Sequence, residues 1–289
     1  MYHVNNAVII AAGTSSRFAP ISYEMPKALI KVKGEVLIER QIKQLKEAGI
    51  DDITIVVGYK KEQFEYLKEK FSVKLVENKD YLTRNNNASI YVVKDILKNT
   101  YICSSDNYFS VNPFESEVDD SYYSAVYADG KTNEWCMEED EEGYINSVTV
   151  GGENKWFMLG HTFWNEEFSK KFVEILEKIY DDPETTNLLW EAIYMKHLDV
   201  LKMKMRKYED DVIFEFDSLD ELRCFDTNYI EDTHSEILKS VCKTLECKES
   251  DLKNICSYTD ADNSAAGFTF ETENEKYLYS YDNCNLRRV

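Results

Sequence analysis

Basic residues are scarce in this sequence. Its 289 residues include 34 Lys and Arg against 54 Asp and Glu, which gives a formal net charge of −20 at pH 7. A protein of this charge repels nucleic acid and anionic lipid at long range. We therefore expect neither as a partner, although a local basic pocket for phosphates is compatible with the overall charge.

Long apolar runs are also missing. Nowhere do about 18 uninterrupted apolar residues occur, as a membrane-spanning helix would require. Residues 1–6 lack the basic start and apolar core of a signal peptide. The seven cysteines form no Cys-x-x-Cys pair and have no His at ligand spacing, which disfavours a disulfide framework and a zinc site. These features predict a cytoplasmic protein with reduced thiols and no membrane contact.

Repeats, Pro-rich linkers and low-complexity tracts are absent, which excludes repeat and linker architectures. The four histidines show no partner spacing, so the sequence does not predict a nucleophilic triad. A hydrophobic fraction of 43% over this length is enough for a substantial core.

What the sequence does contain is an alternation of short β-branched runs and amphipathic stretches. Strands are expected at residues 7–10, 53–57, 73–76 and 100–103, and helices at 36–49, 64–71 and 89–97. This alternation predicts an α/β fold, with a Rossmann-like mixed and mostly parallel sheet flanked by helices.

The second half of the chain has a different texture. Aromatic-rich strands are expected at residues 122–127 and 156–164, followed by a helix over 168–179. From about residue 231 a helix precedes two strands that flank a polar turn at 271–276. We predict a catalytic domain over residues 1–230 and a small C-terminal appendage over 231–289.

The first expected strand leads into a loop of small residues that contains Gly13 and ends at Arg17. Such a loop lets backbone N–H groups face an anion while the guanidinium binds phosphate oxygens. A strand-to-helix turn also needs small residues for purely structural reasons, so the loop alone does not decide the matter. The continuation to Pro20 and Pro26 adds a second cation, Lys27, about ten residues after Arg17 in a segment stiffened by two prolines.

This series resembles the sugar-phosphate nucleotidyltransferase superfamily, and more narrowly the bacterial CTP:phosphocholine cytidylyltransferases. It comprises Ala11, Ala12, Gly13, Thr14, Ser15, Ser16 and Arg17, with Pro20, Pro26 and Lys27 behind them. The narrower likeness rests on further stretches that follow in order between residues 5 and 225, among them 57–59, 105–108, 132–135, 190–191 and 214–218. Ser15 departs from the pattern, because the family usually has a Gly there and Ser resists positive φ.

The resemblance assigns roles to residues of the nucleotide half. Arg17 and Lys27 become catalytic cations, and the loop from Ala11 to Ser16 binds the nucleotide. Asn86 and Ser89 become candidates for contacts to the base or ribose, with a helix N-cap at residues 85–87 as an equally good explanation.

Two carboxylates are assigned to Mg²⁺ by the same resemblance. Asp106 ends the apolar run 101–103 and should lie at the carboxyl edge of the sheet, where open α/β folds bind ligands; capping of a turn is the alternative. Glu215 and Asp217 lie two apart in an alternating stretch, so we expect both side chains on one face of a strand. A solvated acidic face is the alternative there, and the resemblance makes Asp217 the second Mg²⁺ ligand.

The four tryptophans all lie in the half expected to bind the acceptor. Trp135 and Trp190 adjoin Glu134 and Glu191, and aromatic faces beside carboxylates can hold a quaternary ammonium. With Glu215, these residues form the predicted acceptor site. Core packing is the alternative for any single Trp, and Trp156 and Trp164 are expected to be core residues.

The resemblance implies an Mg²⁺-dependent transfer of a cytidylyl group from CTP to phosphocholine, giving CDP-choline and pyrophosphate. One alternative keeps the fold and changes the acceptor to a sugar 1-phosphate or an aminoalkylphosphonate. Another is a non-catalytic nucleotide-binding module, which Ser15 would permit. The C-terminal residues also faintly resemble the opening of a choline-kinase-like domain, so fusion or association with such a domain is a third possibility, without phosphotransfer activity of its own.

Overall fold

The computed structural model describes residues 1–260 and 265–289. Contacts divide the chain into two compact units, each made of two segments. Unit 1 comprises Met1–Gly13 and Leu37–Glu215, and unit 2 comprises Thr14–Val36 and Phe216–Val289. This grouping differs from the division at residues 230 and 231 that the sequence texture suggests, which stays a prediction.

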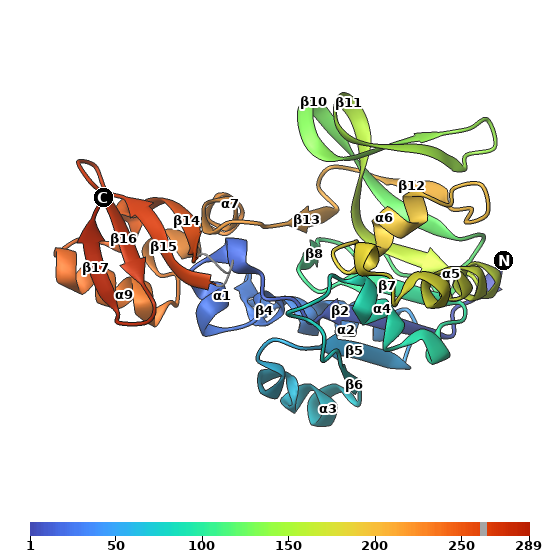
Figure 1. The fold of residues 1–289 in the computed structure, drawn as a ribbon, viewed down its shortest axis with the longest axis horizontal. Coiled ribbons are helices and arrows are strands. Elements are labelled where there is room, and N and C mark those ends of the chain that lie inside the picture. Colours follow the sequence, from blue (N-terminus) through green and yellow to red (C-terminus); the bar gives the residue numbers. More distant parts are fainter. Residues whose placement is uncertain (261–264) are drawn as a thin grey trace. The chain divides into compact units, whose positions relative to one another are not determined.

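A seven-stranded sheet forms the centre of unit 1 (Figure 1). Its order is β12 (Lys204–Tyr208), β10 (Tyr122–Glu139), β11 (Ile145–Trp164), β7 (Thr100–Ser104), β2 (Asn6–Ala11), β5 (Ile53–Val57) and β6 (Lys74–Glu77). Only β11 runs antiparallel to its two neighbours, and the remaining pairs are parallel. The predicted mixed, mostly parallel sheet is confirmed.

Helices enclose this sheet because its central strands are apolar on both faces. Consecutive residues Val8 and Ile9 of β2 are both fully buried although their side chains point to opposite faces. The helices of the unit are α2 (Leu37–Glu47), α3 (Tyr66–Phe71), α4 (Asn87–Tyr91), α5 (Glu166–Ile179) and α6 (Trp190–Met195). On one face Ile90 of α4, Phe172 of α5 and Ile193 of α6 share a core cluster with Val8.

Several predicted elements of unit 1 match closely and three differ. The strand at 53–57 is β5, and the helix expected over 36–49 is α2, after which Gly49 takes φ 83°. The helix expected over 89–97 is shorter, because α4 ends at Tyr91 and only a 3-10 turn, Lys94–Ile96, follows. The strands β10 and β11 run far beyond their predicted ends, since they pair as one long hairpin.

Unit 2 combines short elements with a second sheet. Its N-terminal segment holds α1 (Ile21–Glu24) and a hairpin of β3 (Lys31–Val32) and β4 (Glu35–Val36). The two hairpin turn residues, Lys33 and Gly34, have φ 49° and 85°, as a type I′ turn requires. The C-terminal segment holds α7 (Leu219–Phe225), α8 (Asn228–Glu231) and α9 (Glu236–Leu245).

The last residues of unit 2 form an antiparallel sheet of β14 (Lys253–Thr259), β15 (Ala265–Glu271), β16 (Lys276–Ser280) and β17 (Asn285–Arg288). The predicted helix and the predicted turn between two strands are confirmed, as α9 and the β15–β16 connection. The outer strands β14 and β17 escaped prediction because they are polar edge strands with few apolar residues.

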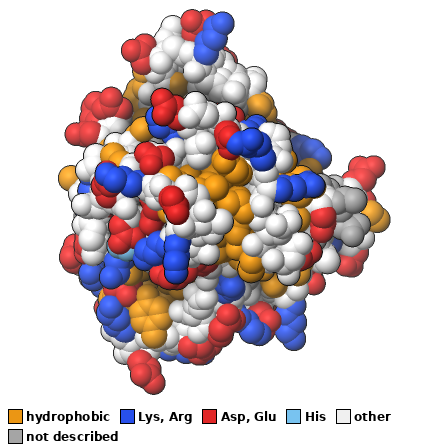
Figure 2. All heavy atoms as spheres, turned by 90° about the vertical axis from the view of Figure 1, so that its left-hand side faces the viewer, with side chains coloured by type: hydrophobic (Ala, Val, Ile, Leu, Met, Phe, Trp, Pro, Cys, Tyr) orange, Lys and Arg blue, Asp and Glu red, His pale blue; other side chains and the backbone are white. Residues whose placement is uncertain are grey.

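No helix among the described residues is long and apolar enough to cross a membrane. All seven cysteines are free. On the face drawn in Figure 2, side chains of both charges surround an apolar patch, and the described residues visible there form no continuous basic area.

Candidate active site

Three parallel strands end side by side at one edge of the unit 1 sheet. Ala11 of β2 lies beside Val57 of β5, and Ile10 lies beside Ser104 of β7. The Ser105 N–H donates to the Ile10 carbonyl at 3.2 Å, which ties the turn that carries Asp106 to β2. The Ala11–Gly13 loop and Asp106 therefore share the carboxyl edge, where ligands of open α/β folds bind.

Gly58 supports the Ala11–Gly13 loop from the neighbouring strand. A Cβ atom at this position would lie 2.8 Å from the Ala12 carbonyl oxygen and 2.8 Å from the Tyr81 ring. The adjacent Tyr59 N–H donates to the same Ala12 carbonyl at 3.0 Å. Only glycine permits this close approach. The contact gives a physical reason for Gly58, which the sequence had singled out only through the family resemblance of residues 57–59.

Buried polar groups of α2 fix the backbone around Asp106. The Gln41 side chain is fully buried, and its amide donates to the carbonyls of Ser104 at 2.8 Å and Asn107 at 2.9 Å. Arg40 donates to the Phe109 carbonyl at 2.8 Å, and its guanidinium lies 4.6 Å from the Tyr108 ring centre. The sequence analysis missed both residues. The signal for Gln41 was a polar residue on the apolar stripe of an amphipathic helix.

Ser15 takes the conformation that glycine would favour. It has φ 48° and ψ 41° and precedes the 3-10 turn Ser16–Phe18, without a capping side-chain hydrogen bond. A non-glycine residue in this left-handed region costs about 1–2 kcal/mol. The substitution of Ser for Gly has therefore not prevented the backbone from entering the left-handed region.

The two predicted catalytic cations converge on Asp217 within unit 2. Arg17 Nη1 lies 2.6 Å from Asp217 Oδ2, and Lys27 Nζ lies 3.6 Å from Oδ1. Arg17 is 75% exposed at its side chain while Lys27 is only 5% exposed. The Asp217 carboxylate therefore pairs with both cations in this structure, whereas the sequence assigned it to Mg²⁺. The catalytic roles of the three residues stay predictions.

The strand expected to carry Glu215 and Asp217 is shorter than predicted. β13 (Ile213–Glu215) pairs with β8 (Asn107–Phe109) and ends at Glu215. The Asp217 N–H donates to the Glu221 side chain at 2.7 Å in place of a strand partner. The prediction that both carboxylates project from one face of a strand is therefore wrong, and Glu215 and Asp217 fall in different units.

The donor atoms predicted for a metal suit Mg²⁺ chemically. Asp106 and Asp217 offer carboxylate oxygens without thiolate or imidazole, as hard divalent cations prefer. Within the described part of the chain, no group of three or more His, Cys, Asp or Glu side chains is arranged to hold a metal ion. Mg²⁺ typically takes only one or two carboxylates and completes its shell with substrate phosphates and water, so the residues fit this metal. Their metal role stays a prediction.

A carboxylate lies among aromatic side chains at the start of α6. Glu191 Oε2 accepts a hydrogen bond from Asn86 Nδ2 at 3.1 Å, and Oε1 accepts one from the Tyr123 hydroxyl at 3.4 Å. Burial raises the pKa of Glu191 to about 7, against the opposing effect of these hydrogen bonds. The pKa of Tyr123 is raised by burial and then by the charges of Glu191 and Glu215. Two acids therefore act electrostatically on one buried tyrosine, which sequence reasoning had missed.

Asn86 caps α6, a role that sequence reasoning did not foresee. Its side-chain oxygen accepts from the Trp190 N–H at 2.7 Å, while its amide nitrogen binds Glu191. It makes no side-chain capping bond to α4, which begins at the next residue. Asn86 thus occupies the N-cap position of α4, as the alternative explanation expected, but its side chain serves α6. The Ser89 hydroxyl is buried and accepts from Asn78 Nδ2 at 3.1 Å. Nucleotide contacts by Asn86 and Ser89 stay predictions.

The tryptophans divide into core and half-buried rings. Trp164 is a core residue as expected, and Trp190 is 2% exposed and stacks on Tyr123 with ring centres 5.7 Å apart. Trp135 and Trp156 are half-buried and pack against the same core cluster, and Glu134 is exposed. Of the two tryptophans predicted to bind the acceptor, Trp135 is partly accessible, while Trp190 is buried and packs against Tyr123.

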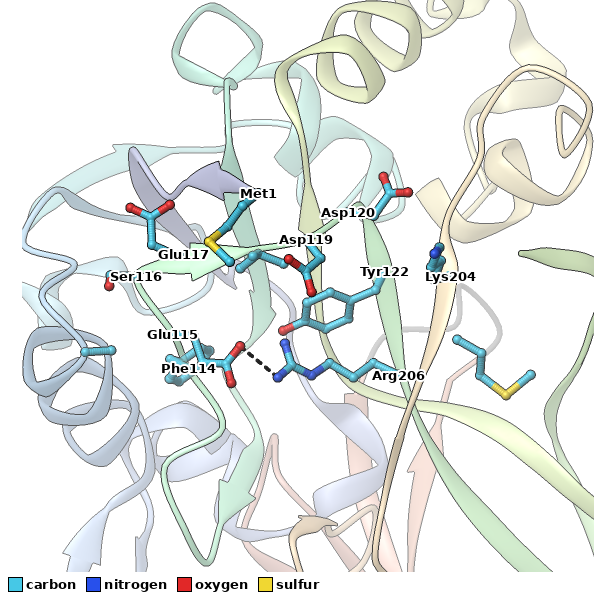
Figure 3. A pocket seen from close by; sticks show the side chains of 13 residues that line it. Met1, Phe114, Glu115, Ser116, Glu117, Asp119, Asp120, Tyr122, Lys204 and Arg206 are labelled. Carbon is cyan, nitrogen blue, oxygen red and sulfur yellow. Dashed lines mark ion pairs between the residues drawn. The ribbon is translucent and has the colours of Figure 1, made fainter. Parts of the chain in front are cut away.

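A separate hollow of about 790 Å³ lies where β10 and β12 begin, at the opposite edge of the sheet (Figure 3). Arg206 points toward Glu115 there, forms an ion pair of 2.8 Å with it, and lies 4.8 Å from the Tyr122 ring centre. Four carboxylates line the hollow: Glu115, Glu117, Asp119 and Asp120. None of the predicted site residues lines it, and its acids disfavour a phosphate ligand.

Comparison with known proteins agrees with this geometry. Residues 7–103 match the family model of the MobA-like NTP transferase domain. The choline-phosphate cytidylyltransferase of Streptococcus pneumoniae is 38% identical over 217 residues, which cover 75% of this chain and 95% of that protein. The 2-aminoethylphosphonate cytidylyltransferase of Lancefieldella rimae is 35% identical over 229 residues, 78% of this chain and 93% of that protein. The chain belongs to this family of bacterial cytidylyltransferases.

Solved structures give the same result. The CTP:phosphocholine cytidylyltransferase of Streptococcus pneumoniae superposes with a TM-score of 0.75 at 36% identity, covering 78% of this chain and 99% of that one. A UDP-glucose pyrophosphorylase with a TM-score of 0.61 and 14% identity shares the fold. These relatives give no support to a choline-kinase-like C-terminal domain, which stays a prediction.

We predict that Ser15→Gly stabilises the protein. Glycine relieves the left-handed strain, partly offset by the greater entropy of the unfolded chain, so the free energy of unfolding should rise by about 0.5–1 kcal/mol. Urea unfolding followed by circular dichroism measures this. Ser16→Gly, next to it in the 3-10 turn, is the control and should destabilise by a similar amount. A loss of stability in Ser15→Gly as large as that in Ser16→Gly would contradict the left-handed strain inferred for Ser15.

We predict that Gln41→Leu lowers activity more than the neighbouring control Gln44→Leu. The Gln41 amide binds the carbonyls on both sides of Ser105 and Asp106, and leaving buried carbonyls without a donor costs about 1–3 kcal/mol. Gln44 is also buried on α2 but donates only to the Phe109 carbonyl, at 3.2 Å. We expect kcat to fall about tenfold or more in the first variant and less than threefold in the second. Equal losses of kcat at equal melting temperatures would rule out this role.

Proposed function

We propose that this protein transfers the cytidylyl group of CTP to phosphocholine, releasing pyrophosphate and forming CDP-choline. The observation that carries the choice of acceptor is the pairing of Glu191 with Tyr123 in an aromatic setting, with a second carboxylate at Glu215. The relatives named choline-phosphate cytidylyltransferase support the same choice.

The aromatic region suits a quaternary ammonium group. Tyr123 receives the negative potential of Glu191 and Glu215, and the half-buried Trp135 belongs to the same cluster of side chains. A trimethylammonium group has no N–H to donate, so charge and aromatic contact must hold it. Both Glu191 oxygens already accept hydrogen bonds from the protein, which leaves charge as their main contribution to a ligand. Roles for Glu134 and Trp190 are less direct, because one is exposed and the other is buried.

Phosphate chemistry falls to the cations of unit 2. A phosphomonoester has its second pKa near 6 and is largely dianionic at neutral pH, so phosphocholine needs no strong base to attack. The exposed Arg17 can bind phosphate oxygens with its planar fork, and the buried Lys27 offers a point charge. We assign them to the nucleotide phosphates, with the Ala11–Ser16 loop supplying backbone N–H groups. Mg²⁺ held by Asp106 and Asp217 would supply further neutralisation of phosphate charge when bound.

The second candidate acceptor is 2-aminoethylphosphonate. It is favoured by one specific observation, the 35% identity to the Lancefieldella rimae enzyme of that name. A primary ammonium group donates three hydrogen bonds and therefore needs several acceptor atoms with unused lone pairs. The occupied oxygens of Glu191 fit this requirement less well than they fit choline.

A non-catalytic module is a weaker proposal than an enzyme. It rested on Ser15, and Ser15 adopts the backbone conformation open to glycine. A sugar 1-phosphate acceptor would require polar groups for its hydroxyls, and both oxygens of the Glu191 carboxylate already accept hydrogen bonds from the protein. The use of CTP and the free thiols favour a cytoplasmic location.

An acceptor panel tests the proposal directly. Pyrophosphate release from CTP and Mg²⁺ should be at least tenfold faster, as kcat/KM, with phosphocholine than with phosphoethanolamine, 2-aminoethylphosphonate or glucose 1-phosphate. Asp106→Asn should lose most of the turnover while keeping its melting temperature. Preference for 2-aminoethylphosphonate would replace phosphocholine by the second candidate, and tight CTP binding without turnover would favour the non-catalytic module.

The raised pKa of Glu191 predicts a pH-dependent affinity for choline. Below its pKa of about 7 the carboxyl is protonated and neutral, so choline should bind about tenfold more weakly at pH 5.5 than at pH 8. Choline itself is the probe, because it lacks the titrating phosphate. Glu191→Gln should bind weakly and without this pH dependence, whereas the exposed control Glu134→Gln should keep it. An affinity that is flat with pH in the parent protein would disprove the role of Glu191.

A further inference from the structure

The segment that carries both catalytic cations packs against the C-terminal part of the chain. Helix α1 lies between Arg17 and Lys27 in sequence, and its Tyr23 ring stacks on Tyr281 with centres 3.8 Å apart and planes 6° from parallel. Tyr281 directly follows β16, and its N–H donates to the Ala266 carbonyl of β15 at 2.9 Å. The stacking partner of α1 is therefore anchored to the C-terminal sheet.

The next residue of α1 makes a second connection. The Glu24 carboxylate accepts from the Ile237 N–H at 3.1 Å, in the first turn of α9. N–H groups in the first turn of a helix lack partners within the helix, and its positive end favours an anion. Glu24 thus caps a helix of the C-terminal segment from the segment that carries the cations.

A third connection lies on the other side of Lys27. The Tyr229 hydroxyl donates to the Lys31 carbonyl at 2.6 Å, and the Asp226 carboxylate accepts from the Lys33 N–H at 2.6 Å. The buried Arg223 donates to the carbonyls of Tyr229, Leu252 and Glu249, which joins this contact to the residues that lead into β14. Backbone on both sides of Lys27 is therefore held by the same C-terminal structure.

We propose that the C-terminal part of unit 2, residues 223–260 and 265–289, positions Lys27 for the nucleotide, with Tyr281 as the positioning residue through its stack on Tyr23. This inference rests on the proposed function, because it assumes that Lys27 binds CTP phosphates. The matched regions of the relatives in the family cover about three quarters of this chain, so a segment of this size lies outside the similarity that defines the family.

Lys27 is the group most sensitive to such support. Its side chain is 5% exposed, lies 3.6 Å from Asp217, and has its ammonium 5.8 Å from the Phe18 ring centre. A long lysine side chain loses about 2 kcal/mol of rotamer entropy when it is held in one place, and a displacement of about 1 Å can reduce a rate a hundredfold. Support of the backbone at residues 23–24 and 31–33 limits that displacement.

Steady-state kinetics of the full chain test the proposal with three variants. Tyr281→Leu removes the stack, Tyr281→Phe keeps it, and Tyr277→Leu is the matched control, since Tyr277 stacks on Phe270 within the same sheet. We expect Tyr281→Leu to lower kcat/KM for CTP about tenfold while KM for phosphocholine stays within twofold. Tyr281→Phe and Tyr277→Leu should stay within twofold of the parent in both. Equal losses in Tyr281→Leu and Tyr277→Leu, at temperatures where both are folded, would reduce Tyr281 to a structural residue.

A double variant tests whether Tyr281 acts through Lys27. Residues that act as one unit are non-additive, so Lys27→Met with Tyr281→Leu should be no slower with CTP than Lys27→Met alone. A further tenfold loss in the double variant would overturn the proposal.

Chemical labelling separates this inference from the proposed function. Acetylation of Lys27 by acetic anhydride, followed by mass spectrometry, should be at least fivefold faster in Tyr281→Leu than in the parent or in Tyr277→Leu. This result needs no substrate, so it holds even if the parent turns over no CTP. Unchanged labelling would overturn the positioning role whatever the enzyme's substrate.

Discussion

The candidate site at the carboxyl edge of the unit 1 sheet depends on the parallel pairing of β2 with β5 on one side and with β7 on the other. Neighbouring strands that run in the same direction end at the same edge of a sheet, so the loops that follow β2, β5 and β7 lie close together. The buried Gln41 amide and the bare Cα of Gly58 then set the backbone of the loops. Gln41 of α2 and Gly58 thus help to determine where Ala12 and Asp106 lie.

Charge is distributed differently in the two halves of the chemistry. Asp217 satisfies two cations in unit 2, where a phosphate ligand would compete with it for Arg17 and Lys27. Glu191 in unit 1 has no cationic partner of this kind, and burial raises its pKa to about 7. A cationic acceptor beside Glu191 would offset the cost of burying the charged carboxylate and so favour its ionised form.

The sequence predicted the elements whose pattern is local. β5 and α2 appeared with nearly correct ends because β-branched runs and helical spacing are properties of a few adjacent residues. Contacts between distant residues were beyond its reach. Asn86 was assigned to the nucleotide, with capping of its own helix as the alternative, whereas its side chain accepts from the first N–H of α6, 104 residues later. Tyr123 was missed because its partner Glu191 lies 68 residues away in the sequence. The strand expected to reach Asp217 stops at Glu215, since pairing with β8 ends there. No periodicity reports where a partner strand runs out.

The division of the chain into units built from two segments each has a consequence for biosynthesis. Residues 14–36 leave the ribosome before most of unit 1, yet their partners in unit 2, residues 216–289, are made only after unit 1. Unit 1 needs only the chain up to Glu215 for its sheet and helices, and domains tend to fold as they emerge. During synthesis the segment with Arg17 and Lys27 must therefore wait as an uncovered loop between β2 and α2. The proposed catalytic cations would then reach their final positions only after unit 1 has folded.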